Sequence, residues 1–122
     1  RATQNVKSWL PASRQNSPSA VADRTKKYIE QNFSRNLTFQ QVARDLHYSH
    51  SVMTRMFKKN FGLSPIAFRN RLRTFESIGL LLLKGSDISS VCREVGFSSV
   101  SRFDKHFRNF SDTIPSEFRM GP

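Results

Sequence analysis

The chain contains one twelve-residue pattern twice, and its fold must accommodate both copies. Residues 38–49 read TFQQVARDLHYS, and residues 87–98, which lie 49 positions further on, read DISSVCREVGFS. The matched pairs are Thr38/Asp87, Phe39/Ile88, Val42/Val91, Ala43/Cys92, Leu46/Val95, Tyr48/Phe97 and Ser49/Ser98. After one inserted residue the match resumes with Phe57/Phe107, Pro65/Pro115, Phe68/Phe118 and Arg69/Arg119. The sequence therefore predicts two copies of one small folding unit.

Apolar residues recur at intervals of three and four, which is the spacing of an amphipathic helix. No stretch alternates with a period of two for long enough to predict a strand, so the expected fold class is all-α. The expected helices cover about 19–33, 39–46, 50–61, 65–84, 88–95 and 99–110, with a last helical turn from Pro115. Each copy of the pattern is then a short helix, a tight turn and a second helix, which is a helix-turn-helix.

Residues with known terminal preferences flank these helices. Thr38 and Asp87 are N-cap candidates for the short helix of each copy, and Ser19 is the candidate for the helix that precedes them. Gly62 and Gly96 follow predicted helices, where a residue in the left-handed conformation commonly ends a helix. The ends of the helices are thus predicted independently of their apolar faces.

Composition along the chain suggests how it is divided. Residues 1–18 lack periodicity and are expected to form a linker or tail. The rest divides into a first helix-turn-helix subdomain at 19–63, a linker helix at 64–84 and a second subdomain at 85–122. Gly79 inside the linker helix suggests that another helix packs closely against it. The chain begins with Arg, which leaves room for an upstream domain.

The charge restricts the classes of partner. The chain has 20 Lys and Arg against 9 Asp and Glu, a net charge of +11. This balance predicts a polyanionic partner, either nucleic acid or an anionic membrane surface. The longest apolar run, residues 78–83, is too short to cross a bilayer. The single Cys92 excludes an internal disulfide and a multi-cysteine zinc site.

The second helix of each copy has an apolar stripe and an opposite polar face. The residues expected to face inward are Met53, Met56 and Phe57 in the first copy, and Phe103, His106, Phe107 and Phe110 in the second. The polar faces offer hydroxyls and cations suited to base edges in a DNA major groove, and the predicted base-reading residues are Ser51, Thr54, Arg55, Ser101, Arg102 and Lys105. The predicted phosphate contacts, near the helix N-termini and at the far end of each face, are Ser49, His50, Lys58, Ser98, Ser99 and Arg108.

The distribution of acidic residues supports this interpretation. Between Asp45 and Glu76 the chain has no Asp or Glu. Six cations in that stretch are Arg55, Lys58, Lys59, Arg69, Arg71 and Arg73. A surface that serves only solubility usually mixes both signs of charge. The stretch is therefore interpreted as part of a DNA-binding surface.

The motifs resemble the DNA-binding domain of AraC/XylS-type transcriptional regulators. The first copy with its continuation, LTFQQVARDLHYSHSVMTRMFKKNFGLSPIAF, resembles the family's first helix-turn-helix, and DISSVCREVGFSSVSRFDKHFRNFSDTIPSEFR resembles its signature. The resemblance covers about residues 21–119. It implies two helix-turn-helix subdomains joined by a linker helix, with the two recognition helices in successive major grooves. It also implies a bacterial cytoplasmic regulator, nucleoid-associated when bound, and most often an activator that acts through RNA polymerase, with an effector-binding or dimerisation domain elsewhere.

The chain departs from the family pattern at several positions. His47 takes the place of the first turn glycine, and Asp112 stands where the signature usually has glycine, so the end of that helix is expected to close differently. Ile114 replaces the usual Thr or Ser before Pro115. The linker helix reads LRTFESIGLLLL and not the more usual LRI..A..LL, so its packing is expected to differ.

Two other function classes are alternatives to a sequence-specific regulator. A non-specific nucleic-acid-binding or architectural protein, or a membrane-surface binder, would also need the positive charge. Against this class, the cations stand at helical spacing, and no aromatic residues are interleaved for base stacking. For an enzyme the chain has no paired carboxylates, nucleophile–base set, phosphate loop or metal cluster. The sequence therefore predicts no catalysis, no cofactor, no metal and no membrane partner.

Overall fold

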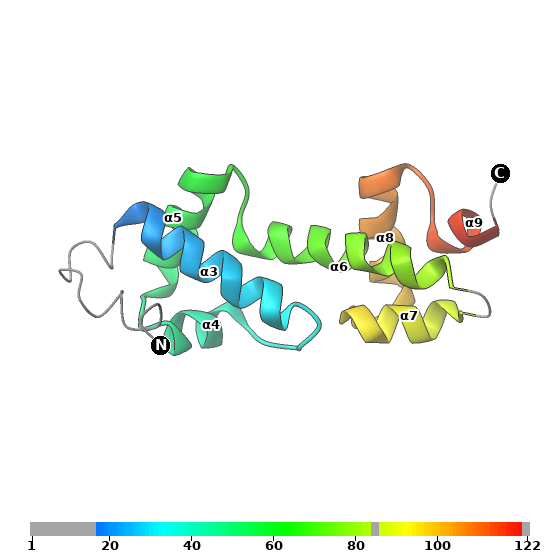
Figure 1. Ribbon diagram of the computed structural model, residues 1–122, viewed down its shortest axis with the longest axis horizontal. Helices are drawn as coiled ribbons and strands as arrows, with labels where there is room; N and C mark the ends of the chain where they lie inside the picture. The colour runs from blue at the N-terminus through cyan, green and yellow to red at the C-terminus, as the bar shows by residue number, and fades with distance from the viewer. Residues whose placement is uncertain (1–16, 84–85, 121–122) are drawn as a thin grey trace, which may run out of the picture. The chain divides into compact units, whose positions relative to one another are not determined.

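The computed structural model describes residues 17–83 and 86–120, and all secondary structure within them is helical (Figure 1). The helices are α3 (Pro18–Asn32), α4 (Phe39–Asp45), α5 (His50–Phe61), α6 (Pro65–Leu81), α7 (Ile88–Val95), α8 (Val100–Ser111) and α9 (Pro115–Met120). The predicted all-α fold class is confirmed. The predicted linker or tail at 1–18 lies, apart from residues 17 and 18, outside the described residues.

The described chain forms two compact units. The first contains residues 17–29 and 37–65, and the second contains residues 30–36, 66–83 and 86–120. Each unit holds one copy of the repeated helix-turn-helix, α4–α5 in the first and α7–α8 in the second. The end of α3 and the loop after it belong to the second unit, as does α6 beyond Pro65. The division into subdomains at 63 and 84 stays a prediction.

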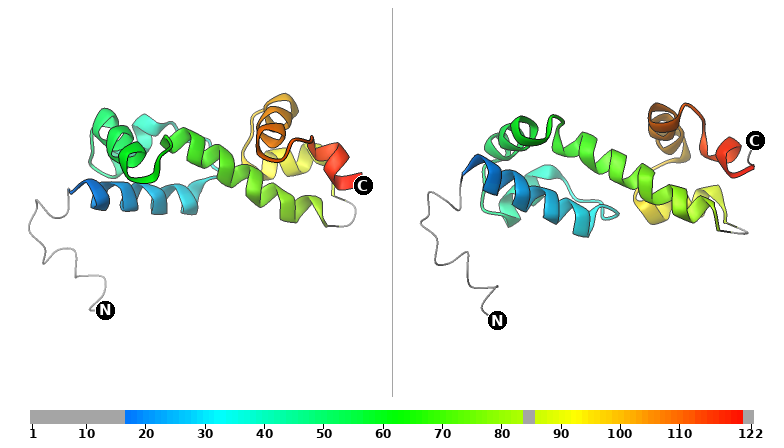
Figure 2. Two further views of the ribbon diagram at one scale, coloured as in Figure 1. Left: turned by 90° about the horizontal axis from the view of Figure 1, so that it is seen from above. Right: turned by 45° about the horizontal axis from the view of Figure 1, so that its top comes forward.

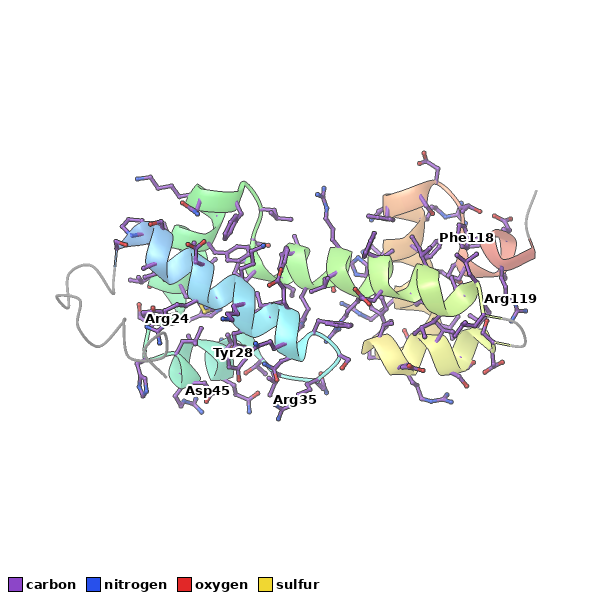
Figure 3. The ribbon with its side chains drawn as sticks, viewed as in Figure 1. Arg24, Tyr28, Arg35, Asp45, Phe118 and Arg119 are labelled. Carbon is purple, nitrogen blue, oxygen red and sulfur yellow. The ribbon has the colours of Figure 1, made fainter. Side chains whose placement is uncertain are left out.

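The first unit packs α3 against its helix-turn-helix. Its fully buried side chains include Val21 and Ala22 from α3, with Met53 and Phe57 from α5. Removing such apolar surface from water is the main favourable term in folding. The Tyr28 hydroxyl donates to an Asp45 carboxylate oxygen over 2.5 Å and joins α3 to α4 at the surface (Figure 3).

The second unit has an aromatic core. Its buried residues are Leu81, Val91, Cys92, Val95, Phe97, Phe103 and Phe107. They come from α6, α7, the turn and α8, which lie next to one another in Figure 2. Phe118 on α9 packs its ring 5.5 Å from that of Phe107, and the neighbouring Arg119 guanidinium donates to the Ser86 carbonyl (Figure 3). These two contacts close the second unit at its C-terminal end.

The helix ends follow the expected chemistry in most places. The Thr38 hydroxyl accepts from the Gln41 amide, and the Gln41 side chain accepts in return from the Thr38 amide, which forms a capping box. A carboxylate oxygen of Asp87 accepts from the Ser90 amide over 3.1 Å. Gly62 ends α5 in the left-handed conformation at φ 81°. The caps predicted at Thr38, Asp87 and Gly62 are confirmed.

Two helix boundaries differ from the prediction. The cap of α3 is Ser17, whose hydroxyl accepts from the Ala20 amide over 3.3 Å, and Ser19 lies inside the helix. Proline favours the first helical position, so Pro18 and not Ser19 starts the helix. At its other end α6 stops at Leu81, because the Leu83 amide donates to the Leu80 carbonyl in a tighter turn.

The repeat extends further than the twelve-residue pattern. Arg24 and Thr25 on α3 are followed 49 positions later by Arg73 and Thr74 on α6. Thr25 and Thr74 are both buried, and each hydroxyl donates to the carbonyl four residues earlier, over 2.7 and 2.8 Å. The repeated unit therefore consists of three helices. The helix α3 precedes the first helix-turn-helix, and α6 precedes the second in the same way.

Candidate nucleic-acid interface

The turn of the first helix-turn-helix is held by an aromatic residue and an arginine. His47 adopts a positive φ of 64°, and the chain then enters α5 at its N-cap, Ser49. Tyr48 between them is clamped by Arg24 of α3, which donates to its hydroxyl over 2.9 Å and lies 5.4 Å from the ring centroid. His47 thus takes the conformation that glycine would adopt most easily. The contact between Arg24 and Tyr48 fixes where α5 starts relative to α3.

The second turn uses the same design with different side chains. Gly96 takes φ 103°, and Phe97 after it is buried. The Arg73 guanidinium lies 5.7 Å from the Phe97 ring centroid. Phe97 also stacks on Phe103 at 5.5 Å and on His106 at 5.4 Å, both from α8. The ring therefore holds the recognition helix to the turn that precedes it.

Gly96 is required by contact as well as by backbone conformation. A Cβ atom at this position would lie 2.7 Å from the Ser34 carbonyl oxygen and 3.0 Å from the Arg73 guanidinium carbon. Both distances are shorter than an ordinary van der Waals contact of about 3.5–4.0 Å. The loop after α3 therefore packs directly on the turn between α7 and α8.

The predicted reading face of α5 is displayed as the sequence suggested. Met53 and Phe57 are fully buried, and Met56 is half-buried. On the opposite face Ser51, Arg55 and Lys58 are exposed, while Thr54 is half-buried. Phe57 also packs on Phe61 with ring centroids 4.9 Å apart, which fixes the last turn of α5. The helix therefore offers a polar surface on a rigid support, as direct contact with base edges requires.

The predicted reading face of α8 is fully exposed. Ser101, Arg102, Lys105 and Arg108 all face solvent, and Phe103 and Phe107 are completely buried. The structure corrects one inward prediction on this helix, since Phe110 is 44% exposed. His106 is half-buried through its contact with Phe97. Arg102 and Lys105 share this surface with His106, so their charges act on its imidazole.

The predicted phosphate contacts at the helix starts are also exposed. Ser49 and Ser99 are the N-caps of α5 and α8, and each hydroxyl accepts from a backbone amide over 3.2 Å. A hydroxyl that accepts in this way still has its proton to donate to a phosphate oxygen. His50 and Ser98 are exposed beside them. The geometry is compatible with phosphate binding at both starts.

Arg73 does not belong to the cationic surface with which the sequence grouped it. It is only 5% exposed, and it donates to the Phe33 carbonyl over 2.6 Å and to the Arg35 carbonyl over 3.1 Å. Burial, followed by the charges of Arg69 and Arg102, lowers the pKa of Arg73 to about 10. The guanidinium is therefore protonated at neutral pH and serves the fold.

Two other titratable groups are shifted within the second unit. Burial, then the charges of Arg102, Lys105 and Arg73, lower the pKa of His106. The imidazole is therefore neutral at pH 7 and can stack on Phe97 without adding a charge. Burial raises the pKa of the Cys92 thiol, so that it stays protonated. Cys92 thus acts as a small core residue, as its pairing with Ala43 suggested.

A shallow groove of about 560 Å³ runs beside the second reading face. It lies between the first half of α6 and the second half of α8, and its lining residues are Ile66, Ala67, Asn70, Arg71, Thr74, His106, Asn109 and Phe110. The exposed Phe110 ring, which the sequence placed in the core, lies in this wall. The lining contains no carboxylate and one cation, Arg71.

The described residues offer neither a metal cluster nor a membrane span. Among residues 17–83 and 86–120, no three His, Cys, Asp or Glu side chains come together in a way that could hold a metal ion. None of the helices in the same ranges has the length and apolar content that crossing a bilayer requires.

The chain matches known proteins over the region that contains both helix-turn-helix copies. A family model described as a helix-turn-helix domain matches residues 42–121, which is more than half of the chain. The Lactose operon transcription activator of Staphylococcus xylosus is 29% identical over 92 residues, which are 75% of this chain and 33% of that protein. The chain thus spans about a third of the length of this relative.

Solved structures share the arrangement of helices. The C-terminal domain of AraT, a response regulator from Geobacillus stearothermophilus, matches with a TM-score of 0.78 and 27% identity, covering 84% of this chain and 85% of that one. The DNA-binding domain of AdpA, solved in complex with a target DNA, has the same fold with a TM-score of 0.75 at 18% identity, covering 81% and 89%. Together with the repeated motifs, these matches show that the chain belongs to the AraC/XylS-type helix-turn-helix family of transcription-regulator DNA-binding domains.

Proposed function

We propose that this DNA-binding domain is sequence-specific and reads two successive major grooves of one duplex, one with α5 and one with α8. The observation that carries the proposal is the pair of exposed polar faces held on matched buried scaffolds. Ser51, Thr54 and Arg55 form one reading head, and Ser101, Arg102 and Lys105 form the other. Arg can bind guanine through two hydrogen bonds, while Ser and Thr can contact several bases.

The two reading heads differ although their supports match. Met53 and Phe57 support the first face as Phe103 and Phe107 support the second, and all four are fully buried. The exposed residues at equivalent positions are not the same. The preferred DNA site should therefore be asymmetric, and one chain should bind it in one orientation.

The activity of the whole protein is a further part of the proposal. The relative from Staphylococcus xylosus is named as a transcription activator, and this chain spans about a third of its length. We propose that the protein activates transcription in the bacterial cytoplasm by contacting RNA polymerase. A separate domain would bind an effector or a second subunit.

Selection of bound duplexes from a random library tests the specificity. The expected result is one asymmetric site with two conserved blocks about 34 Å apart. The affinity for that site should fall by roughly 10³–10⁵-fold between 50 and 200 mM salt if 6–10 phosphates are contacted. Equal binding to random duplexes and single strands would overturn sequence specificity and favour a non-specific or architectural protein.

A further inference from the structure

The outer face of α6 has an apolar stripe that is exposed at three of its four positions and half-buried at Leu72. Leu72, Phe75, Gly79 and Leu82 follow one another at spacings of three, four and three residues, which places them on one side of a helix. Phe75 is 61% exposed and Leu82 is 70% exposed. The stripe shares no residue with the predicted DNA-reading faces. A contiguous exposed apolar surface of this kind commonly marks an interaction site.

The stripe continues to Leu82, one residue past the end of α6, on the same side of the helix. The Leu82 amide still donates to the Ile78 carbonyl, four residues earlier, over 3.1 Å. The side chain of Leu82 therefore projects from the same side of the helix as Phe75 and Gly79. At Gly79 a Cβ atom would meet no atom of the other described residues within 4 Å, apart from the adjacent backbone of α6. The stripe thus has a bulky ring and, one turn further, an empty position.

We propose that this stripe is a self-association surface, on which the α6 helix of a second copy of the chain packs antiparallel. In a two-fold pair centred on position 77, Phe75 of each copy lies over Gly79 of the other, and Leu72 lies over Leu82. The same patch then serves both copies, as a two-fold interface requires. The ring fills the space that glycine leaves, so the surface is complementary to itself.

The positions of the ring and the glycine select the antiparallel direction. In a parallel pair Phe75 would face Phe75 of the other copy, and Gly79 would face Gly79. The two rings would then compete for one space, and the two glycines would leave another space empty. In the antiparallel pair each ring lies over a glycine. The direction therefore follows from the alternation of a large and a small residue along the stripe.

Analytical ultracentrifugation of the DNA-free chain tests the proposal. One helix face buries less than about 1,200 Å², the lower end of the range for stable interfaces, so we expect half-association at roughly 0.1–1 mM. About 0.5 M salt should be present to screen the repulsion between two chains of net charge +11. Phe75→Ala should weaken association at least tenfold, because the exposed ring contributes most of the contact. Phe110→Ala, which removes another exposed ring of the same unit, is the matched control and should leave association unchanged.

Crosslinking tests the direction of packing. A chain carrying both Leu72→Cys and Leu82→Cys should form an intermolecular disulfide on mild oxidation, while each single variant should not. The two positions lie about 15 Å apart along one helix, so they cannot bridge within one chain. Cys92 is buried and should not react. A chain that stays monomeric up to about 1 mM, association that Phe75→Ala leaves unchanged, or crosslinking by the single variants would each overturn the proposal.

Discussion

The Arg73 guanidinium lies 5.7 Å from the centre of the Phe97 ring and holds it from the side of α6. Arg24 and Tyr48 have the same relationship in the first unit, at 5.4 Å. Arg24 and Arg73 are 49 positions apart in the sequence, and so are Tyr48 and Phe97. An arginine from the preceding helix thus clamps the aromatic residue of each turn. This relationship shows that the sequence duplicates a three-helix unit and not a helix-turn-helix alone.

Replacing Arg73 by Met should destabilise the second unit by about 2–4 kcal/mol. The change removes two hydrogen bonds from a charged donor to the Phe33 and Arg35 carbonyls, each worth about 1.5–3 kcal/mol, and some apolar packing of Met offsets part of the loss. Urea unfolding followed by circular dichroism measures the effect. Arg71→Met, at an exposed arginine of the same helix, should change the free energy of unfolding by less than about 0.5 kcal/mol. Equal effects of the two variants would contradict the structural role of Arg73.

The role of Arg73 shows what the sequence could not supply. Its place among six cations in a stretch without acids suggested a DNA contact. Arg73 differs from the other five cations because its side chain donates to carbonyls of the loop after α3, which is far away in sequence. The one local signal was the Arg-Thr pair repeated 49 positions apart, Arg24-Thr25 and Arg73-Thr74. Over that longer span the repeat pairs Arg73 with Arg24 and indicates a structural role for both.

Two glycines with positive φ should respond differently to alanine. Gly62→Ala places a side chain in the left-handed conformation where no atom lies within 4 Å, so it should cost about 1–2 kcal/mol. Gly96→Ala has the same backbone cost and also forces the new Cβ against Ser34 and Arg73, which should add roughly 1–3 kcal/mol. Denaturant unfolding of both variants measures the difference. If Gly62→Ala were the more costly change, the close packing at Gly96 would be refuted.

Gly79→Ala should stabilise the isolated chain by about 1 kcal/mol. The sequence suggested that Gly79 admits a neighbouring helix, but an added Cβ would meet no atom within 4 Å among residues 17–83 and 86–120, apart from the backbone of α6 next to it. Alanine therefore gains its helix propensity over glycine without any steric cost. The measurement is thermal unfolding at low micromolar concentration, where self-association is negligible. A melting temperature lower than that of the unchanged chain would show that another part of the chain packs against Gly79.

Local chemistry was predicted better than burial. Caps at Thr38, Asp87 and Gly62 depend on residues within one turn of the helix end, and the sequence contains them all. Phe110 illustrates the opposite case. It follows the apolar spacing of α8, but it lies beyond the last turn that the core covers and is 44% exposed. How far a neighbouring helix extends is a tertiary property, which periodicity along one helix does not report.

Stability should fall as the pH drops below about 6.5, and His106 should be responsible. Its pKa is lowered in the folded chain by burial and by the charges of Arg102, Lys105 and Arg73. Between that lowered value and the unfolded value near 6.5, the unfolded chain binds a proton that the folded chain does not. The free energy of unfolding therefore decreases as the pH falls through this window and levels off below it. In urea unfolding from pH 7.5 to 5, His106→Gln should flatten the decrease, and His50→Gln, at an exposed histidine of α5, should retain it.

Arg55→Ala and Lys105→Ala should each weaken binding to the selected duplex and relax base preference at one block only. Both side chains are exposed on the recognition helices, and neither makes a hydrogen bond or ion pair with another described residue, so both are available to DNA. Losing a good contact with a base edge should cost about 1–3 kcal/mol of discrimination, which is roughly five- to 150-fold in affinity. Lys27→Ala removes an exposed cation from α3, outside both reading faces, and should leave the base preference unchanged. Because the two heads stand on separate recognition helices, the Arg55 variant should alter one block and the Lys105 variant the other. Loss of preference at both blocks from either variant, or at neither, would refute the assignment of one reading head to each groove.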